Sequence, residues 1–445
     1  MVRRALSAIF ALATLATTIL ADSAKCGPGN LCPKETPCCG QYGDCGVGAF
    51  CLGGCDPLFS ATLDSCVPNP TCKGGDYSLD SLDDVQDISL YLGDASKINW
   101  QSQGKTVAYP PKDPNSLLLT MAEGTVGSLL ASTHYVWYGK ICATMTTSQG
   151  KGVVTAFIMM SDVRDEIDFE WIGVDINNAQ SNYYSQGVTV YTNANNLTVS
   201  PNTVEKLHEY CIDWKPDALT WSVDGKDMRT VQKKETWNST SNRFDYPQTP
   251  SRIMLSLWPA GLATNGKGTI DWAGGVIDWN SKYMQNGYYF ARVQSITVDC
   301  YDPPSGAKIN GKKSYKYTGT AGTNDTIQIT DDLVVLGSLM GTGENPGEAP
   351  KSDAPEPTAT VAMVPGGNPG GGGRQETPAS VALSAGQTSA GGDTTQINPT
   401  AGANSGTFVQ GTTNPSTGAS MQPGLGKISG SALAIVLAVL GLCVL

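Results

Sequence analysis

Short apolar runs separated by turn residues fill the central part of the chain, residues 74–335. Gly, Asn and Asp punctuate these runs, which is typical of antiparallel strands joined by turns. The pattern predicts an all-β fold in which two antiparallel sheets pack as a sandwich. The runs that we expect to be strands include Ser116–Met121, Val136–Thr146, Val153–Met160, Gly187–Tyr191, Leu219–Val223 and Ile253–Trp258.

The segments on either side follow different patterns. Residues 26–72 contain no long apolar run but nine cysteines, which predicts a small module held by disulfides. Residues 340–430 are rich in Gly, Ser, Thr, Pro and Ala and have few aromatic residues. Such a segment buries too little apolar area to fold, so we expect a disordered, O-glycosylated stalk.

Both ends of the chain carry targeting patterns. Residues 1–21 combine Arg3 and Arg4, an apolar stretch and the small residue Ala21, which predicts a signal peptide. Residues 431–445 form an apolar tail that follows a polar spacer and a group of small residues. This order predicts a GPI anchor signal with attachment at Gly418; a short tail anchor is the alternative.

The net charge limits the kinds of partner that the protein can bind, and the cysteine content indicates the cellular compartment. The net charge of -11 argues against a nucleic-acid partner. In a secreted chain the cysteines predict disulfides; zinc is disfavoured because His134 and His208 lie far from them. If Cys443 is removed with the tail, twelve cysteines remain and can pair fully. The module cysteines that we expect in disulfides are Cys26, Cys32, Cys38, Cys39, Cys45, Cys51 and Cys55; Asn196, Asn238 and Asn324 begin glycosylation sequons.

The candidate chemistry lies in one strand-like segment, Asp165-Glu166-Ile167-Asp168-Phe169-Glu170. Alternate side chains of a strand share a face, so Glu166, Asp168 and Glu170 form a row of acids opposite Ile167 and Phe169. Like charges at this spacing raise the pKa of at least one carboxyl. One acid can then donate a proton while another stays ionised.

The spacing also predicts the type of reaction. The Cα atoms of Glu166 and Glu170 should lie roughly 13 Å apart in an extended strand. Their side chains can lean together until the carboxyl groups are about 5 Å apart, which is the separation of a retaining glycosidase. The alternative is a solvated acidic strand edge.

The acid row resembles the signature of glycoside hydrolase family 16, and its surroundings match in order and spacing. The further matching segments are Tyr138-Gly139-Lys140, Gly152–Phe157, Glu170–Gly173, His208-Glu209-Tyr210, Ile212-Asp213-Trp214 and Val223-Asp224-Gly225. Within the family the chain resembles the Crh-type fungal cell-wall transglycosylases over residues 74–335. The resemblance implies a β-jelly roll with a cleft across its concave sheet.

The resemblance also implies roles for the three acids. Glu166 is the nucleophile that forms a glycosyl-enzyme intermediate. Glu170 protonates the leaving oxygen and then deprotonates the acceptor. Asp168 lies between them and hydrogen-bonds Glu166. Water as the acceptor gives hydrolysis and a sugar hydroxyl gives transfer, and the acid row alone does not choose between them.

Other residues are candidates for holding sugars. Trp258 and Trp272 rank first because one ends a strand-like run and the other lies in a Gly-rich segment. Tyr138, Tyr183, Arg243 and Gln248 are further candidates, although aromatic residues in strands more often belong to the core. We expect no metal and no cofactor.

The cysteine spacing of residues 26–72 resembles a hevein-type chitin-binding module, with Tyr42 and Phe50 at two of its aromatic positions. The usual Ser is replaced by Gly40, and Asp44 stands at a third aromatic position. Sugar binding by this module is therefore in doubt. The alternative is a disulfide-braced cap on the catalytic domain.

The targeting patterns predict an extracellular, GPI-anchored or wall-bound protein, and we expect a monomer. The resemblance to the Crh-type enzymes implies that it cleaves chitin and transfers it to β-glucan. A hydrolytic β-glucanase or chitinase is the alternative among enzymes. A non-catalytic wall lectin or structural mannoprotein is the alternative of another class.

Overall fold

The computed structural model describes residues 24–109, 115–348 and 363. The chain divides into two compact units, Met1–Gln410 and Gly411–Leu445, and all described residues lie in the first. The predicted signal peptide, Gly418 and the tail 431–445 lie outside the described residues. No helix in the described ranges is long and apolar enough to cross a membrane.

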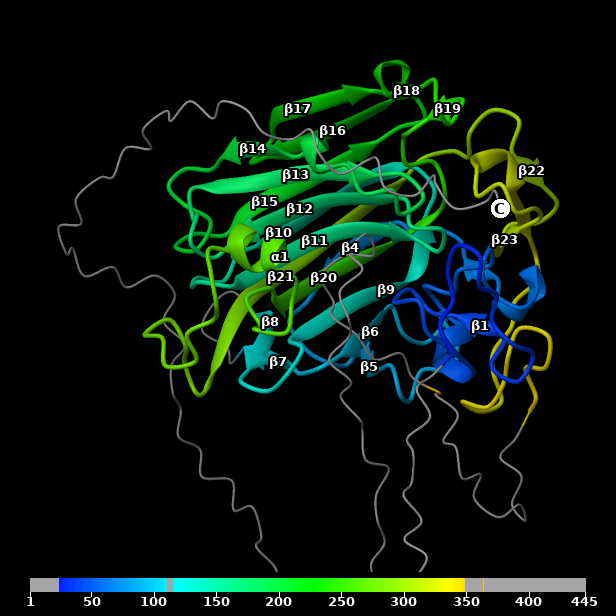
Figure 1. The fold of residues 1–445 in the computed structure, drawn as a ribbon, viewed down its shortest axis with the longest axis horizontal. Helices are drawn as coiled ribbons and strands as arrows, with labels where there is room; N and C mark the ends of the chain where they lie inside the picture. The colour runs from blue at the N-terminus through cyan, green and yellow to red at the C-terminus, as the bar shows by residue number, and fades with distance from the viewer. Residues whose placement is uncertain (1–23, 110–114, 349–362, 364–445) are drawn as a thin grey trace, which may run out of the picture. The chain divides into compact units, whose positions relative to one another are not determined.

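Two large sheets make up most of the described fold, and their strand pairs are antiparallel except for the parallel pair of β5 and β6 (Figure 1). One sheet has the strand order β17 (Lys226–Gln232), β16 (Ala218–Val223), β15 (His208–Trp214), β10 (Gly139–Met145), β21 (Tyr288–Cys300), β8 (Ser116–Ala122) and β7 (Thr106–Tyr109), with β4 (Gly75–Ser78) also paired to β21. The other has the order β14 (Asn195–Thr198), β13 (Asn178–Tyr184), β12 (Glu166–Ile172), β11 (Val153–Ser161), β20 (Ser251–Pro259), β9 (Ser128–Val136), β6 (Trp100–Gln103) and β5 (Val85–Asp87). The predicted all-β sandwich is confirmed.

Small elements complete the described structure. The helix α1 (Lys267–Trp272) follows β20. Short strands are β1 (Cys38–Cys39), β2 (Cys45–Gly46), β3 (Asn69–Pro70), β18 (Trp237–Asn238), β19 (Arg243–Phe244), β22 (Lys308–Ile309), β23 (Ser314–Tyr317) and β24 (Ile327–Thr330), and 3-10 turns cover Gly48–Cys51, Leu63–Ser65, Tyr191–Asn193, Lys233–Thr236 and Asn324–Thr326.

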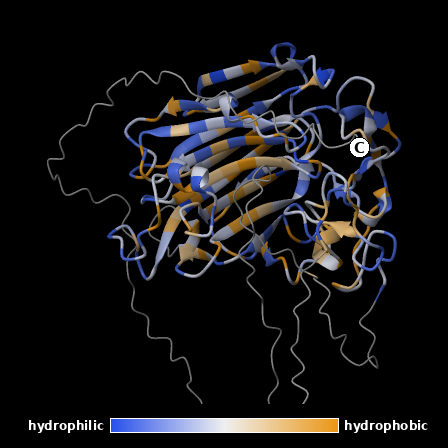
Figure 2. Cartoon of the chain, in the orientation of Figure 1, coloured by the Kyte–Doolittle hydropathy of each residue, from blue (hydrophilic) through white to orange (hydrophobic). Residues whose placement is uncertain are grey.

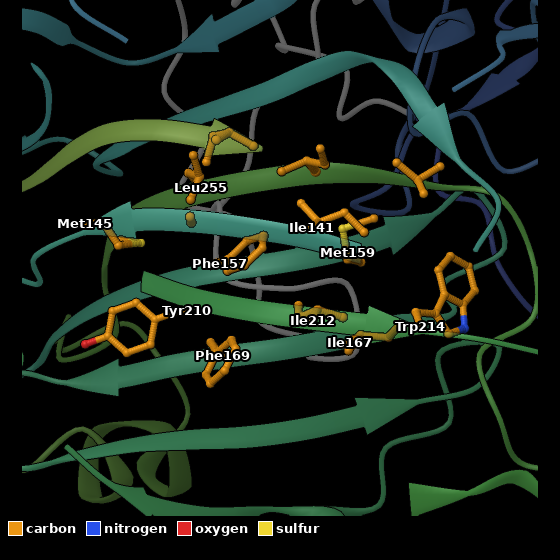
Figure 3. Packing of buried hydrophobic residues seen from close by; sticks show 14 of the residues in the cluster. Ile141, Met145, Phe157, Met159, Ile167, Phe169, Tyr210, Ile212, Trp214 and Leu255 are labelled. Atoms are coloured by element: carbon orange, nitrogen blue, oxygen red, sulfur yellow. The ribbon is translucent and has the colours of Figure 1, made fainter. Parts of the chain in front are cut away.

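The core lies between the two sheets and draws side chains from both. Phe157 and Phe169 on one sheet pack with Ile141, Tyr210 and other residues of the opposite sheet in a single buried cluster (Figure 3). All nine residues of β11 are buried, as expected for a central strand rich in Val, Ile and Met. Figure 2 shows the same contrast, with apolar colour along the central strands and hydrophilic colour along the outer loops.

Two of the expected strands differ from the structure. The run Val136–Thr146 is broken at Tyr138, whose φ of 66° makes the turn between β9 and β10. The run Gly187–Tyr191 is not a strand, because Gln186 and Gly187 adopt positive φ and a 3-10 turn begins at Tyr191. Both errors arise from left-handed residues, which apolar patterning does not reveal.

Disulfides brace both the small module and the sandwich. The described residues contain six disulfides: Cys26–Cys39, Cys32–Cys45, Cys38–Cys51, Cys55–Cys66, Cys72–Cys300 and Cys142–Cys211. The first four lie within residues 26–72 and include all seven module cysteines that the sequence singled out. The fifth joins the end of this module to the last residue of β21.

The segment expected to begin the stalk at residue 340 is still part of the folded structure through residue 348. Gly48 donates a backbone hydrogen bond to Gly341 (2.9 Å), and Gly343 donates one to Ser65 (2.9 Å). A Cβ on Gly48, where φ is +64°, would lie 2.2 Å from the Leu339 carbonyl oxygen. This close approach requires glycine.

Candidate active site

The strand β12 carries the three acids on one face. Ile167, Phe169 and Trp171 belong to the core cluster between the sheets. Ile167 and Phe169 can be seen there in Figure 3, and the ring centroids of Phe169 and Tyr210 lie 5.5 Å apart. Alternation then places Glu166, Asp168 and Glu170 on the opposite face of the same strand. Their exposed fractions are 3%, 1% and 7%. The acid row is therefore held in a largely buried setting and is not a solvated edge.

Hydrogen bonds fix the position of β12. The indole nitrogen of Trp221 donates to the Asp168 carbonyl oxygen at 2.9 Å. At the start of the strand, buried Asp165 accepts bonds from the backbone of Gln186, Gln248 and Thr249 and from the Thr249 hydroxyl. Burial raises the pKa of Asp165, which these donors oppose. Asp165 ties the turn before Glu166 to two other segments, so the acids sit on a rigid frame.

Strand register identifies the neighbours of the acids. On β13, Tyr184 lies opposite Glu166, Asn182 opposite Asp168, and Gln180 opposite Glu170. Directly paired residues share a face, so these three side chains border the acid row. The amide of Asn182 donates to the Tyr184 hydroxyl at 2.7 Å. The sequence analysis did not predict this polar border. Pairing β12 with the next strand as a hairpin, and then following alternate residues of that strand, would have indicated it.

An apolar patch lies on the other side of the acids. Register pairs Met160 with Glu166, Ile158 with Asp168 and Ala156 with Glu170. These residues form one buried cluster with Leu129, Ala131 and Met254. We call this cluster the apolar patch. An apolar surface beside convergent polar groups is the usual composition of a ligand site.

Two predicted sugar platforms lie near the Glu170 end of the row. Trp258 and Trp272 stack with ring centroids 6.1 Å apart. The Trp272 indole donates to the Gln180 side-chain oxygen at 2.9 Å, and Gln180 is the register partner of Glu170. Trp258 is fully buried beneath Trp272, which is only partly buried. Trp272 is therefore the ring available to a ligand, with Trp258 supporting it.

Tyr183 and Tyr138 do not border the acids, which corrects their selection. Tyr183 pairs with Ile167 and belongs to the core cluster, with the Arg229 guanidinium 5.8 Å from its ring. Tyr138 is fully buried against Trp137 and Trp214. The sequence prediction selected Tyr183, but the neighbouring Tyr184 is the residue on the same face as the acids.

Arg243 and Gln248 have structural contacts. The Arg243 guanidinium donates to the Gln186 side chain and lies 3.4 Å from Asp245. Gln248 is buried; its backbone nitrogen donates to Asp165 and its carbonyl oxygen accepts from Trp137. These contacts give both residues a role in supporting the strand ends.

Phe50 does not form an exposed sugar platform on the cystine module. It is 3% exposed and packs with Leu52, Tyr91 and Leu336. Tyr42 is partly exposed, but its hydroxyl is buried where the module meets the β-sandwich. The two aromatic residues of the hevein-like pattern thus face the β-sandwich, because the module packs against it.

The possible metal-ligand groups in the described ranges consist mainly of disulfide cysteines. They are Cys26, Cys32 and Cys45, and Cys142, Glu209 and Cys211. Every cysteine in both groups is bonded to another cysteine, so no thiolate is present to hold an ion.

A β-sandwich with three buried acids in a row beside stacked tryptophans defines a carbohydrate-active enzyme. Residues 94–274 match the family described as glycosyl hydrolases family 16. The chain is 53% identical to Crh-like protein 2 of Aspergillus fumigatus over 338 residues, covering 75% of each chain. It is 42% identical to Congo red hypersensitive protein 2 of Saccharomyces cerevisiae, covering 72% of this chain and 69% of that protein. A solved structure titled Crh5 transglycosylase in complex with NAG is 29% identical, with a TM-score of 0.49, covering 62% of this chain and 99% of that chain.

The chain belongs to glycosyl hydrolase family 16 and, within it, to the Crh-like proteins of fungi. The family predicted from the acid row and its flanking motifs is confirmed.

Proposed function

We propose that this protein is a retaining transglycosylase that cleaves chitin and transfers the new end to β-1,3- or β-1,6-glucan in the fungal cell wall. The observation that carries the proposal is the acid row of β12. The three acids are buried, and polar residues of β13 lie opposite them in register. The backbone of the strand is held in place by the hydrogen bond from Trp221. Membership of the Crh-like proteins supports transfer over hydrolysis.

The proposed mechanism assigns one step to each acid. The Glu166 carboxylate attacks the anomeric carbon while Glu170 donates its proton to the leaving glycosidic oxygen, which forms the glycosyl-enzyme ester. Glu170 then removes a proton from the acceptor hydroxyl, whose oxygen attacks the same carbon and releases Glu166. Two inversions retain the β configuration. Asp168 hydrogen-bonds Glu166 between these steps.

Transfer requires that a sugar reach the intermediate before water does. The acids have at most 7% exposure, which limits access of bulk water to the ester. Trp272, partly exposed and braced by Trp258 and Gln180, is a rigid platform for a sugar ring next to Glu170. We assign this platform to the sugar on the leaving-group and acceptor side.

We further propose the wider organisation of the protein. Residues 74–335 form the catalytic domain, and residues 26–72 form a module fixed against it. The mature protein is extracellular and monomeric, and it is held at the membrane or wall by a GPI anchor at Gly418. Glycans on Asn196, Asn238 and Asn324 fit secretion.

The test uses the purified protein with a chitin oligomer as donor and a fluorescent β-1,3-glucan oligosaccharide as acceptor. Labelled hybrid products that are absent with Glu166→Gln would support the proposal, and a β linkage by NMR would support retention. Shortened donor without hybrids would identify a hydrolase. No change in either sugar, with binding intact, would identify a lectin or structural protein.

A further inference from the structure

Two side chains of the other sheet contact the strands that carry the acids and their polar border. They are Trp221 on β16 and Arg229 on β17, the edge strand of that sheet (Figure 1). The two residues are direct register partners, so their side chains share one face of the sheet. Trp221 is fully buried in the core cluster between the sheets. The mechanism proposed above gives neither residue a task.

A β-bulge follows this pair directly. Ser222 pairs with Asp227, so Met228 is the extra residue on β17. A bulge bends its strand and changes the direction of nearby side chains, and bulges are common next to active sites. The irregularity of β16 and β17 therefore lies at the pair whose side chains reach the opposite sheet.

Trp221 holds the backbone of the central acid. Its indole nitrogen donates a hydrogen bond to the Asp168 carbonyl oxygen at 2.9 Å. The carbonyl group and the side chain of Asp168 share one Cα atom, so a bond that fixes the carbonyl also limits the positions open to the carboxyl group. Because Trp221 is 0% exposed, the packing around its ring holds the donor in place.

Arg229 holds both the Trp221 ring and the strand beside the acids. Its Nη1 donates to the Ser181 carbonyl and hydroxyl oxygens, each at 2.9 Å, and its Nη2 donates to the Asn193 carbonyl oxygen at 2.7 Å. Ser181 on β13 is the register partner of Phe169 on β12. The guanidinium carbon lies 4.8 Å from the Trp221 ring centroid, which allows a cation–π contact. A single planar group thus links the ring that bonds β12 to the backbone of β13.

We propose that Trp221 and Arg229 are positioning residues of the reaction, which together hold the Asp168 carboxyl group in its working place in the acid row. The inference rests on the proposed function. Both residues act through Asp168 from the core side of the sheet. A displacement of about 1 Å in a reacting group can lower the rate by up to about a hundredfold, so the effect on turnover can exceed the effect on binding.

The test compares Trp221→Phe and Arg229→Met with the wild-type protein. The first change removes the indole donor and keeps an aromatic ring. The second removes the donors and the charge and keeps a long side chain. Since Arg229 is only partly buried, its variant should fold even if the change in the core does not allow folding.

The matched controls are Trp100→Phe and Arg292→Met. Trp100 on β6 is 1% exposed and packs against Tyr77, so its replacement opens the core to the same extent. Arg292 on β21 donates to the Ser116 hydroxyl at 2.8 Å and lies 5.3 Å from the Tyr109 ring, which matches the kinds of contact that Arg229 makes.

Initial rates of labelled hybrid product give kcat and KM for each protein at a temperature well below every melting temperature. We expect kcat to fall about five- to twentyfold in Trp221→Phe and Arg229→Met, with KM for the donor changed by less than about twofold. The controls should lower the melting temperature by similar amounts and keep kcat within about twofold of wild type. If Trp221→Phe and Arg229→Met behave like their controls, the two residues only stabilise the fold and the inference is wrong.

Hydrogen exchange read by mass spectrometry follows the strand itself and does not depend on activity. Peptides that cover residues 165–172 should exchange faster in Trp221→Phe and Arg229→Met than in the two controls. Equal exchange in all variants would overturn the inference even if the rates differ. A wild-type protein without transfer activity would count against the proposed function, and the exchange result would still decide whether the pair holds β12.

Discussion

At the residue scale the three acids differ in the groups around them. Asp168 lies in the middle of the acid row. Its backbone carbonyl oxygen accepts a hydrogen bond from the Trp221 indole, and Asn182 is its register partner on β13. Glu166 faces Tyr184 and Met160, whereas Glu170 faces Gln180, which holds Trp272. The surroundings are asymmetric, as separate nucleophile and acid roles require.

We predict that Glu166→Gln and Glu170→Gln each lower kcat at least about a hundredfold, because each removes a group that bonds to or exchanges a proton with the substrate. Asp168→Asn keeps the shape and one acceptor oxygen and should retain measurable activity. Initial rates of labelled product with circular dichroism as a folding control measure this. Wild-type rates for Asp168→Asn would remove its assigned role.

At the element scale, strand register decides which tyrosine borders the site. Tyr184 and Tyr183 are adjacent in sequence but lie on opposite faces of β13. Alternate residues of a strand share one face of the sheet. A register shift of one residue would therefore move Tyr184 to the core face and Tyr183 to the acid face.

We predict that Tyr184→Phe impairs catalysis severalfold while Tyr183→Phe leaves it unchanged. The first change removes a hydroxyl that Asn182 contacts beside Glu166, and the second removes one on the core side. Measuring kcat and KM for both variants on the same glycan tests this. Equal effects would contradict the register of β13.

At the scale of the whole molecule, long-range links hold the module to the sandwich. The Cys72–Cys300 disulfide joins residues 228 apart in sequence. A second link runs through Asp162, which accepts hydrogen bonds from the Gly54 nitrogen, the Tyr135 hydroxyl and the Asn69 amide. The module is thus part of the same buried network as β9, which carries Tyr135.

We predict that replacing both Cys72 and Cys300 by Ser lowers the free energy of unfolding by about 2–5 kcal/mol, because the unfolded chain regains freedom over a long loop. Urea titration measures this change. The matched variant without Cys142 and Cys211, which closes a loop of sequence separation 69, should lose slightly less. No loss in the first variant would show that packing alone holds the module.

Stability should also depend on pH through Asp56, which is 1% exposed and lies 3.8 Å from Arg164. Burial raises the pKa of Asp56 to about 7, which Arg164 opposes. The folded state therefore binds more protons than the unfolded chain between about pH 4 and pH 7. This group contributes its full stability below about pH 4 and loses it as pH rises through 7.

We expect the urea midpoint to fall by an amount equivalent to roughly 1–4 kcal/mol between pH 4.5 and pH 7.5. Asp56→Asn should reduce that fall, because the amide does not titrate. Asp64→Asn, at an exposed carboxylate paired with Lys316, is the control and should leave the slope unchanged. A slope that is the same in all three proteins would contradict the raised pKa.

The sequence by itself determined the sandwich, the face of the acid row and the family. These follow from alternation along single strands, and local alternation is written directly in the order of residues. It also identified Trp258 and Trp272, because their positions at a strand end and in a Gly-rich segment are local features.

Only the tertiary structure decided which residues from other strands meet the acids. Tyr184, Asn182 and Gln180 reach the site through the register of β13. The burial of Phe50 and Tyr138 likewise depends on elements far away in sequence. Register and packing are set by the sum of many long-range contacts, so no local pattern specifies them.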